Sequence, residues 1–153
     1  MIKVNVVAVG KVKEDYFKKA IEEYSKRLKR FCEFKIIEVN EENSKSEIEL
    51  IKQKEAENIL PHLKGKVIVL AIEGKKISSE ALAKKISDIA SFNQGTVTFV
   101  IGGSYGVSDK IKNTADELVS FSDMTFPHTL FRVLLTEQIY RAFTILNGVN
   151  YHK

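Results

Sequence analysis

Two polar side chains at the start of the last helical segment could take part in chemistry. His128 follows Pro127, and an imidazole changes its charge near neutral pH, so it can accept or donate a proton there. Arg132 comes one helical turn later and could bind a phosphate through its planar N–H donors. Each also has a structural interpretation, because His128 could cap the helix or pack against the turn, and Arg132 could form a surface ion pair.

A glycine-rich segment, "FVIGGSYGVSD" at 99–109, is the second candidate for function. Glycine permits left-handed turns and close backbone approach. The spacing of Gly102, Gly103 and Gly106 is not G-x-G-x-x-G, and no Gly-Lys-Ser/Thr follows, so neither phosphate-binding fingerprint is matched. We expect a ligand close to this loop, and we expect a side chain at Gly103 to fill the space that the ligand needs.

Two further loops follow expected strands, "LAIEGKKISS" at 70–79 and "FSDMTFPH" at 121–128. Ligands of open α/β sheets bind outside the carboxyl ends of the strands. Three such loops could wall one pocket without a charged phosphate cradle. This arrangement favours a bent, partly apolar ligand over a pyrophosphate.

The elements that must position these loops alternate along the chain. Apolar runs of strand length are followed by stretches with helical periodicity, which predicts βαβ units and a parallel sheet covered on both faces, an α/β fold. Ser46 with Glu49 resembles a capping box, and Ser78 or Ser79 offers another N-cap. The expected elements are strand 2–9, helix 14–30, strand 34–39, helix 44–63, strand 66–72, helix 78–92 and strand 96–101, then a short helix and a short apolar segment within 108–122.

The strongest helix prediction covers Leu130 to Leu146. Asn147 and Gly148 supply its stop signal. Glu137 precedes Arg141 by four residues, the favourable orientation for an ion pair within a helix. The apolar residues available for burial are Leu130, Val133, Leu134, Ile139, Phe143 and Leu146.

Composition indicates one domain over residues 1–153. With 44% hydrophobic residues the chain can bury a substantial core. Its apolar runs are far shorter than the about 20 residues of a membrane helix, and the N-terminus lacks the apolar core of a secretory signal. Together with a single cysteine, Cys32, this indicates a cytoplasmic protein without a membrane segment. The three histidines are scattered, so we expect no metal site.

Charge is distributed unevenly around a formal net value of +4. Residues 1–40 carry ten Lys or Arg against six Asp or Glu, so the whole excess lies there. The expected helix 14–30 mixes apolar and basic residues at helical spacing. Its basic side is either a solvated surface or a patch that meets RNA phosphates.

Four segments carry a family resemblance: "VVAVGKVKEDYFKKAIEEY", "VLAIEGK", "FVIGGSYG" and "LVSFSDMTFPHTLFRVLLTEQIYRAFTILNGVNYHK". They resemble the RlmH (YbeA) family, SPOUT-class methyltransferases of 23S ribosomal RNA. The resemblance spans essentially the whole chain, and "PHTLFRVLLTEQIYRA" with the final "YHK" is its most specific part.

The resemblance implies a function and a fold. Such proteins use S-adenosylmethionine (SAM) to methylate N3 of a pseudouridine in the 23S rRNA of the assembled ribosome. They are homodimers whose SPOUT α/β fold carries a deep trefoil knot in the C-terminal part. Threaded loops are nearly absent from ordinary folds, so no periodicity argument predicts the knot.

The resemblance also implies roles for particular residues. The C-terminal tail is expected to dock, in its own or the partner's pocket, with Tyr151 stacking on a base and His152 contacting RNA. His128 is a candidate acceptor for the imide proton of N3, and Arg132 a candidate clamp. The expected cofactor residues are Leu70, Gly102, Gly103, Phe121, Ser122, Asp123, Met124, Thr125 and Phe126.

Two other classes of function stay open on the residues alone. A non-catalytic RNA-binding or ribosome-associated factor would explain the basic helix but not the three strand-end loops. A nucleotide-dependent oxidoreductase or kinase would explain glycines in an α/β sheet, but the chain lacks both phosphate fingerprints.

Overall fold

The strands form one five-stranded parallel sheet in the computed structural model, which describes residues 1–43, 46–92 and 95–153. Strand order is β2-β1-β4-β3-β5, and every hydrogen-bonded pair runs parallel. The carboxyl ends of β4, β3 and β5 therefore lie next to one another. The strands are β1 (Lys3–Val9), β2 (Glu33–Val39), β3 (Lys66–Lys76), β4 (Thr96–Ile101) and β5 (Glu117–Ser120).

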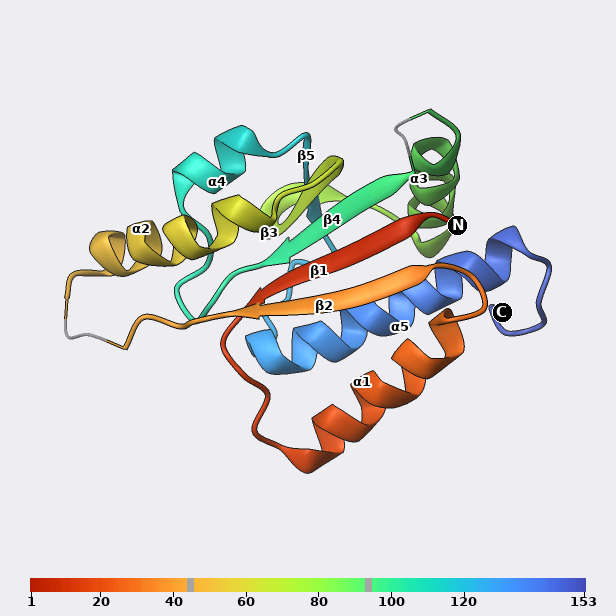
Figure 1. Ribbon diagram of the computed structural model, residues 1–153, viewed down its shortest axis with the longest axis horizontal. Helices are drawn as coiled ribbons and strands as arrows, with labels where there is room; N and C mark the ends of the chain where they lie inside the picture. Colours follow the sequence, from red (N-terminus) through yellow and green to blue (C-terminus); the bar gives the residue numbers. More distant parts are fainter. Residues whose placement is uncertain (44–45, 93–94) are drawn as a thin grey trace.

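Helices cover both faces of this sheet, which confirms the α/β class (Figure 1). One face carries α1 (Asp15–Leu28), α3 (Ser79–Phe92) and α5 (His128–Leu146). The other carries α2 (Ile48–Ile59), the short 3₁₀ helix η1 (Leu60–His62) and α4 (Asp109–Thr114). The trefoil knot stays a prediction.

Burial follows from this two-sided cover. On β1, Val4, Val6 and Ala8 pack into the core beneath α1, α3 and α5, and Val7 and Val9 pack into the core beneath α2 and α4. A parallel strand buried on both faces is apolar at consecutive positions, which is why it reads as an unbroken run in the sequence.

Of the two predicted N-caps, the one of α3 is confirmed and the one of α2 is wrong. The Ser78 hydroxyl accepts the backbone N–H of Ala81 at 3.0 Å and caps α3 as predicted. The capping box of Ser46 and Glu49 is wrong, because α2 begins at Ile48 and Glu47 is its N-cap residue. The first two residues of the helix expected at 44–63 lie outside the described residues, and η1 takes over after Ile59.

The buried face of α5 differs from the predicted one. Ile139 and Phe143 are buried, but Leu146 is exposed and the other three predicted residues are only half-buried. Two threonines take part in the buried face because their hydroxyls donate to carbonyls of the same helix: Thr136 to Arg132 at 2.7 Å and Thr144 to Arg141 at 2.6 Å. The buried residues of α5 are Arg132, Leu135, Thr136, Ile139, Tyr140, Ala142, Phe143 and Thr144.

Three smaller observations bear on the class of protein. Among the described residues, no helix is long and apolar enough to cross a membrane. Within the same ranges, no group of His, Cys, Asp or Glu side chains could hold a metal ion. Cys32 is 2% exposed, and burial raises the pKa of its thiol to about 12, so the thiol stays protonated and unreactive.

Candidate functional site

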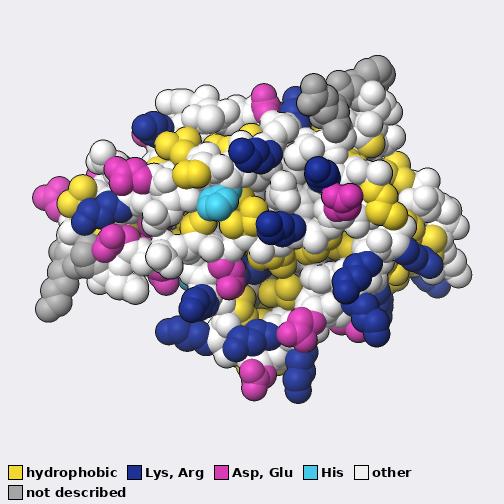
Figure 2. Space-filling view, in the orientation of Figure 1, with side chains coloured by type: hydrophobic (Ala, Val, Ile, Leu, Met, Phe, Trp, Pro, Cys, Tyr) yellow, Lys and Arg dark blue, Asp and Glu magenta, His cyan; other side chains and the backbone are white. Residues whose placement is uncertain are grey.

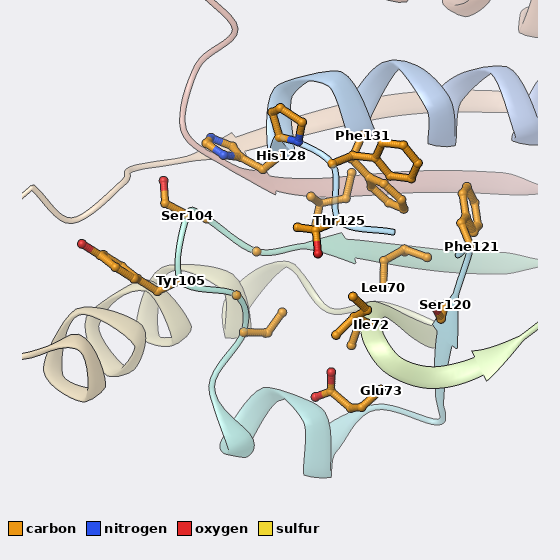
Figure 3. Close-up of a pocket in the computed structure, with 18 of the residues that line it drawn as sticks. Leu70, Ile72, Glu73, Ser104, Tyr105, Ser120, Phe121, Thr125, His128 and Phe131 are labelled. Atoms are coloured by element: carbon orange, nitrogen blue, oxygen red, sulfur yellow. The ribbon is translucent and has the colours of Figure 1, made fainter. Parts of the chain in front are cut away.

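A cavity of about 750 Å³ lies at the carboxyl edge of the sheet (Figure 3). Its walls are the bulged part of β3, the loops that follow β4 and β5, the start of α5 and one side chain each from α2 and α4. The volume falls within the range of roughly 300–1,000 Å³ that is usual for small-molecule sites. The three segments expected from the sequence to wall one pocket are thus brought together, but residues 70–76 of the first belong to β3 and not to a loop.

A bulge in β3 forms the first wall. Leu70 and Lys75 both pair with Val119 of β5, so residues 71–74 leave the ladder. A Cβ atom on Gly74 would lie 2.6 Å from Val119 N, so only glycine lets the bulge return against β5. The bulge extends β3 beyond the predicted end at residue 72 and turns its backbone toward the cavity.

The glycine loop after β4 forms the second wall. Its glycines are required for reasons other than the predicted approach of a ligand. A Cβ atom on Gly102 would lie 2.7 Å from the carbonyl carbon of Gly106, so the loop closes on itself. A Cβ atom on Gly103 would lie 3.1 Å from both Val9 Cγ1 and Glu55 Oε1. Neither of these residues lines the cavity, so the expectation that a side chain at Gly103 fills the ligand's space is wrong.

Residues 121–126 form the third wall, and hydrogen bonds hold this segment in shape. Ser122 accepts the Ser120 hydroxyl at its carbonyl (2.9 Å) and the Met124 N–H at its Oγ (2.9 Å). Lys76 donates to Asp123 at 2.5 Å, which ties the segment to the end of β3. These bonds fix the path of the backbone between β5 and α5.

Most of the predicted cofactor residues lie around the cavity, and so does one predicted catalytic residue, His128. Figure 3 shows His128 above Ser104 of the glycine loop. Asp123 is the exception among the cofactor residues, because its side chain is 80% exposed and is paired with Lys76. The predicted cofactor residues that line the cavity are Leu70, Gly102, Gly103, Phe121, Ser122, Met124, Thr125 and Phe126.

Arg132 lies outside the cavity lining and is 2% exposed. Its guanidinium donates to Glu38 Oε2 at 2.5 Å, to the Gly10 carbonyl at 3.1 Å and to the Val9 carbonyl at 3.4 Å. The side chain therefore links the start of α5 to the carboxyl ends of β1 and β2. Its predicted role as a clamp stays a prediction.

The C-terminal tail is docked on its own chain, away from the cavity lining. The Tyr151 hydroxyl donates to Glu137 at 2.9 Å, and burial followed by this carboxylate raises the pKa of Tyr151, so the phenol stays protonated. His152 contacts Glu80 at 2.6 Å and Arg141 at 3.1 Å. Arg141 also pairs with Glu137 at 2.8 Å, as predicted.

Three charged residues that line the cavity were not anticipated from the sequence: Lys52 on α2, Glu73 on the β3 bulge and Lys112 on α4. Glu73 follows a buried strand at its carboxyl end, a position where ligands bind, so a signal for it existed. The two lysines carry no such signal, because each is one of many lysines on amphipathic helices.

Comparison with known proteins decides the family. A family model described as a predicted SPOUT methyltransferase matches residues 2–152. The chain belongs to the SPOUT methyltransferase family.

Two curated relatives are named ribosomal RNA large subunit methyltransferase H. The one from Latilactobacillus sakei is 49% identical, and the one from Clostridioides difficile is 48% identical. Each match covers 98% of this chain and 99% of the relative.

Solved structures show the same fold at low sequence identity. A probable methylase family protein from Haemophilus influenzae aligns over 98% of this chain and 70% of its own, with a TM-score of 0.59 and 14% identity. A Legionella pneumophila protein in complex with the cofactor SAM aligns over 95% of this chain and 66% of its own, with a TM-score of 0.50 and 12% identity. The SPOUT methyltransferase fold is therefore shared.

A buried carboxyl group lies directly beneath the glycine loop of this SPOUT methyltransferase. Glu55 of α2 is 4% exposed and accepts the backbone N–H of Glu42 at 3.1 Å. Burial raises the pKa of Glu55, and the nearby carboxylates of Glu41 and Glu42 raise it further. Glu41 also accepts the Ser104 hydroxyl at 3.4 Å, so the loop after β2 and the glycine loop are joined.

Stability should therefore depend on pH through Glu55. The unfolded chain loses this proton at a lower pH than the folded chain, so ionisation of Glu55 costs stability as pH rises from the unfolded pKa through the folded pKa. We expect Glu55→Gln to unfold at higher urea than the wild type at pH 8, with the advantage disappearing near pH 4. Glu57→Gln, on the exposed side of the same helix, controls for the loss of charge. An advantage of Glu55→Gln that is equal at both pH values would contradict the expectation.

Proposed function

We propose that this chain uses SAM to methylate N3 of a pseudouridine in 23S rRNA of the assembled large subunit or ribosome. The supporting observation is the cavity that the β3 bulge and two strand-end loops of a SPOUT methyltransferase enclose, with His128 at its edge. The curated relatives are named for methylation of large-subunit rRNA, which supports the substrate class.

The residues around the cavity fit an adenosyl group. Leu70, Ile101 and Phe121 give apolar walls for a purine, and the backbone of Gly102 and Gly103 offers N–H and C=O groups to its edge. Phe131 of α5 packs against Phe121 with 5.0 Å between ring centroids, which holds that wall in place. The cofactor supplies a methyl group bonded to a sulfonium.

The chain's own part in the reaction is positioning and proton transfer. The walls of the cavity would hold the methyl donor beside the base nitrogen, and such positioning would supply most of the acceleration of a direct displacement. Methylation of N3 would also require that the N3 proton leave. His128, the imidazole that lines the cavity, is the proposed acceptor of that proton.

RNA binding is proposed for the basic side of α1 and for the turn that follows it. Lys26, Arg27, Lys29 and Arg30 are candidates for phosphate contact, and Figure 2 shows Lys and Arg side chains gathered over the region where α1 lies, with Asp and Glu among them. Arg27 pairs with Glu23 at 2.9 Å within the helix, so the other three carry most of the charge toward phosphates.

A cytoplasmic homodimer is proposed as the working form. Leu130, Val133 and Leu134 of α5 stay half-exposed in a single chain, and a second copy would cover them. Tyr151 and His152 lie away from the cavity lining of their own chain. The proposed contact of these two residues with RNA therefore places them against the substrate bound by the partner.

Two measurements test this proposal. Calorimetry should show binding of SAM or S-adenosylhomocysteine (SAH) and none of NAD or ATP. Ribosomes that lack the modification should gain one methyl group on the pseudouridine when they are incubated with the protein and SAM. We expect His128→Gln to lower the rate of transfer at least about a hundredfold with SAH affinity unchanged.

Three outcomes count against the proposal or part of it. Binding of neither SAM nor SAH would favour a non-catalytic RNA-binding factor. Methylation of another base would overturn the substrate assignment. Equal losses of transfer and SAH affinity in His128→Gln would make His128 a structural residue.

A further inference from the structure

One side of the cavity carries three charged side chains from three separate elements. Lys52, Glu73 and Lys112 all line it, and we call them the charged cluster. The lysine side chains are only 16% and 22% exposed, so they are recessed in the cavity wall rather than free in solvent. Figure 3 places Glu73 beside α4, on the opposite side of the cavity from His128.

The two lysines of the cluster favour the ionised form of the Glu73 carboxyl. Lys112 forms an ion pair with Glu73, and this contact lowers the pKa of Glu73, with Lys52 adding to the effect. The ion pair of Lys52 is with Glu49, which is 83% exposed and 3.8 Å away, and exposed pairs at that distance are weak. Two positive charges and one negative charge leave a net charge of +1.

We propose that the charged cluster binds the α-amino-acid end of the cofactor, with its carboxylate on Lys52 and Lys112 and its ammonium on Glu73. The inference rests on the proposed use of SAM. A zwitterion needs both signs of charge within a few ångströms, and the cluster presents both. The apolar walls at Leu70 and Phe121 are left for the adenosine.

An RNA phosphate is the competing ligand for two lysines in a cavity. Glu73 argues against it, because a carboxylate in contact with Lys112 repels a second anion that has no cationic group of its own. The recessed position of the lysines also suits a ligand that enters the cavity better than a phosphate that stays on the surface.

Two ligands that differ only at the amino-acid end provide the test. SAH carries that end, whereas 5′-methylthioadenosine has the same adenosine and thioether without it. We expect Lys52→Gln to weaken SAH binding about tenfold or more, as loss of a charged hydrogen bond does, and to leave methylthioadenosine affinity unchanged. Lys112→Gln should do the same, and Lys110→Gln on the exposed side of α4 is the matched control.

The outcomes separate this inference from the proposed function. If the wild type binds neither ligand, the proposed use of SAM fails. If the wild type binds both and Lys52→Gln weakens both equally or neither, the assignment of the cluster is overturned. Unchanged SAH affinity with a lower salt dependence of RNA binding would assign the cluster to phosphate. Thermal unfolding identifies a variant that fails to fold, and Lys52→Gln, which leaves the Lys112–Glu73 pair intact, then decides the question.

Discussion

Alanine at position 102 is expected to lower cofactor affinity more than a hundredfold and the free energy of unfolding by about 3 kcal/mol. A Cβ atom on Gly102 would lie 2.7 Å from Gly106 C, 2.8 Å from Gly106 O and 2.9 Å from Val107 Cγ2. Gly106 N–H closes the same turn onto the Gly103 carbonyl at 3.0 Å. The turn must open to admit a methyl group, and the second wall of the cavity moves with it.

Calorimetry with SAH and urea unfolding measure the two effects of Gly102→Ala. Gly106→Ala is the control in the same loop: Gly106 has φ of +83°, and a Cβ atom on it would have no neighbouring atom within 4 Å. The free energy of unfolding of that variant should fall by only about 1–2 kcal/mol, the cost of an alanine in the left-handed conformation. Its SAH affinity should stay within a few-fold of the wild type. Wild-type affinity and stability in Gly102→Ala would show that the turn yields without moving the wall.

The glycines at 102–106 correctly indicated where the cavity lies, but the predicted reason for them, close approach of a ligand, was wrong at Gly102 and Gly103. Three glycines after an apolar strand indicate a backbone that something approaches closely. In this loop the approaching groups are the loop itself at Gly102 and the Glu55 carboxyl at Gly103. Sequence spacing gives the position of a close approach, but the partner depends on tertiary contacts between α2 and the loop after β4.

The order of the elements was predictable, and the order of the strands was not. Alternating apolar and amphipathic stretches indicate the βα succession because each pattern has its own period. The pairing of β4 between β1 and β3 joins segments that no local pattern relates. The β3 bulge could not be predicted from the sequence either, because it depends on the close contact between Gly74 and Val119 of β5.

Side chains on helices were the least predictable part of the site. Lys52, Glu55 and Lys112 belong to helices whose sequences give no sign that these residues differ from their neighbours. The face of α5 was misjudged for a related reason: a buried arginine reads as a surface residue unless its partners are known. Those partners are Glu38 and two backbone carbonyls from the far end of the chain.

Arg132→Ala is expected to lower the free energy of unfolding by about 3 kcal/mol and to weaken SAH binding. The guanidinium is 2% exposed and donates to Glu38, Val9 and Gly10, so its removal leaves two carbonyls at the end of β1 without this donor. The same side chain anchors the first turn of α5, which begins at His128. We therefore expect the loss of stability and the loss of affinity to occur together, as for a positioning residue.

Glu38→Gln is the matched variant that separates positioning from a direct role. Glu38 is 42% exposed, and an amide oxygen in its place still accepts the bond from Arg132, so its loss of stability should be well below that of Arg132→Ala. Urea unfolding, SAH affinity and methyl transfer are measured on both variants. If Arg132 acts through the link to β1 and β2, Arg132→Ala should lose more than Glu38→Gln in stability, in SAH affinity and in methyl transfer. If Arg132→Ala keeps wild-type stability and SAH affinity but loses transfer, the arginine acts on the RNA itself, because only a contact with the substrate would be missing.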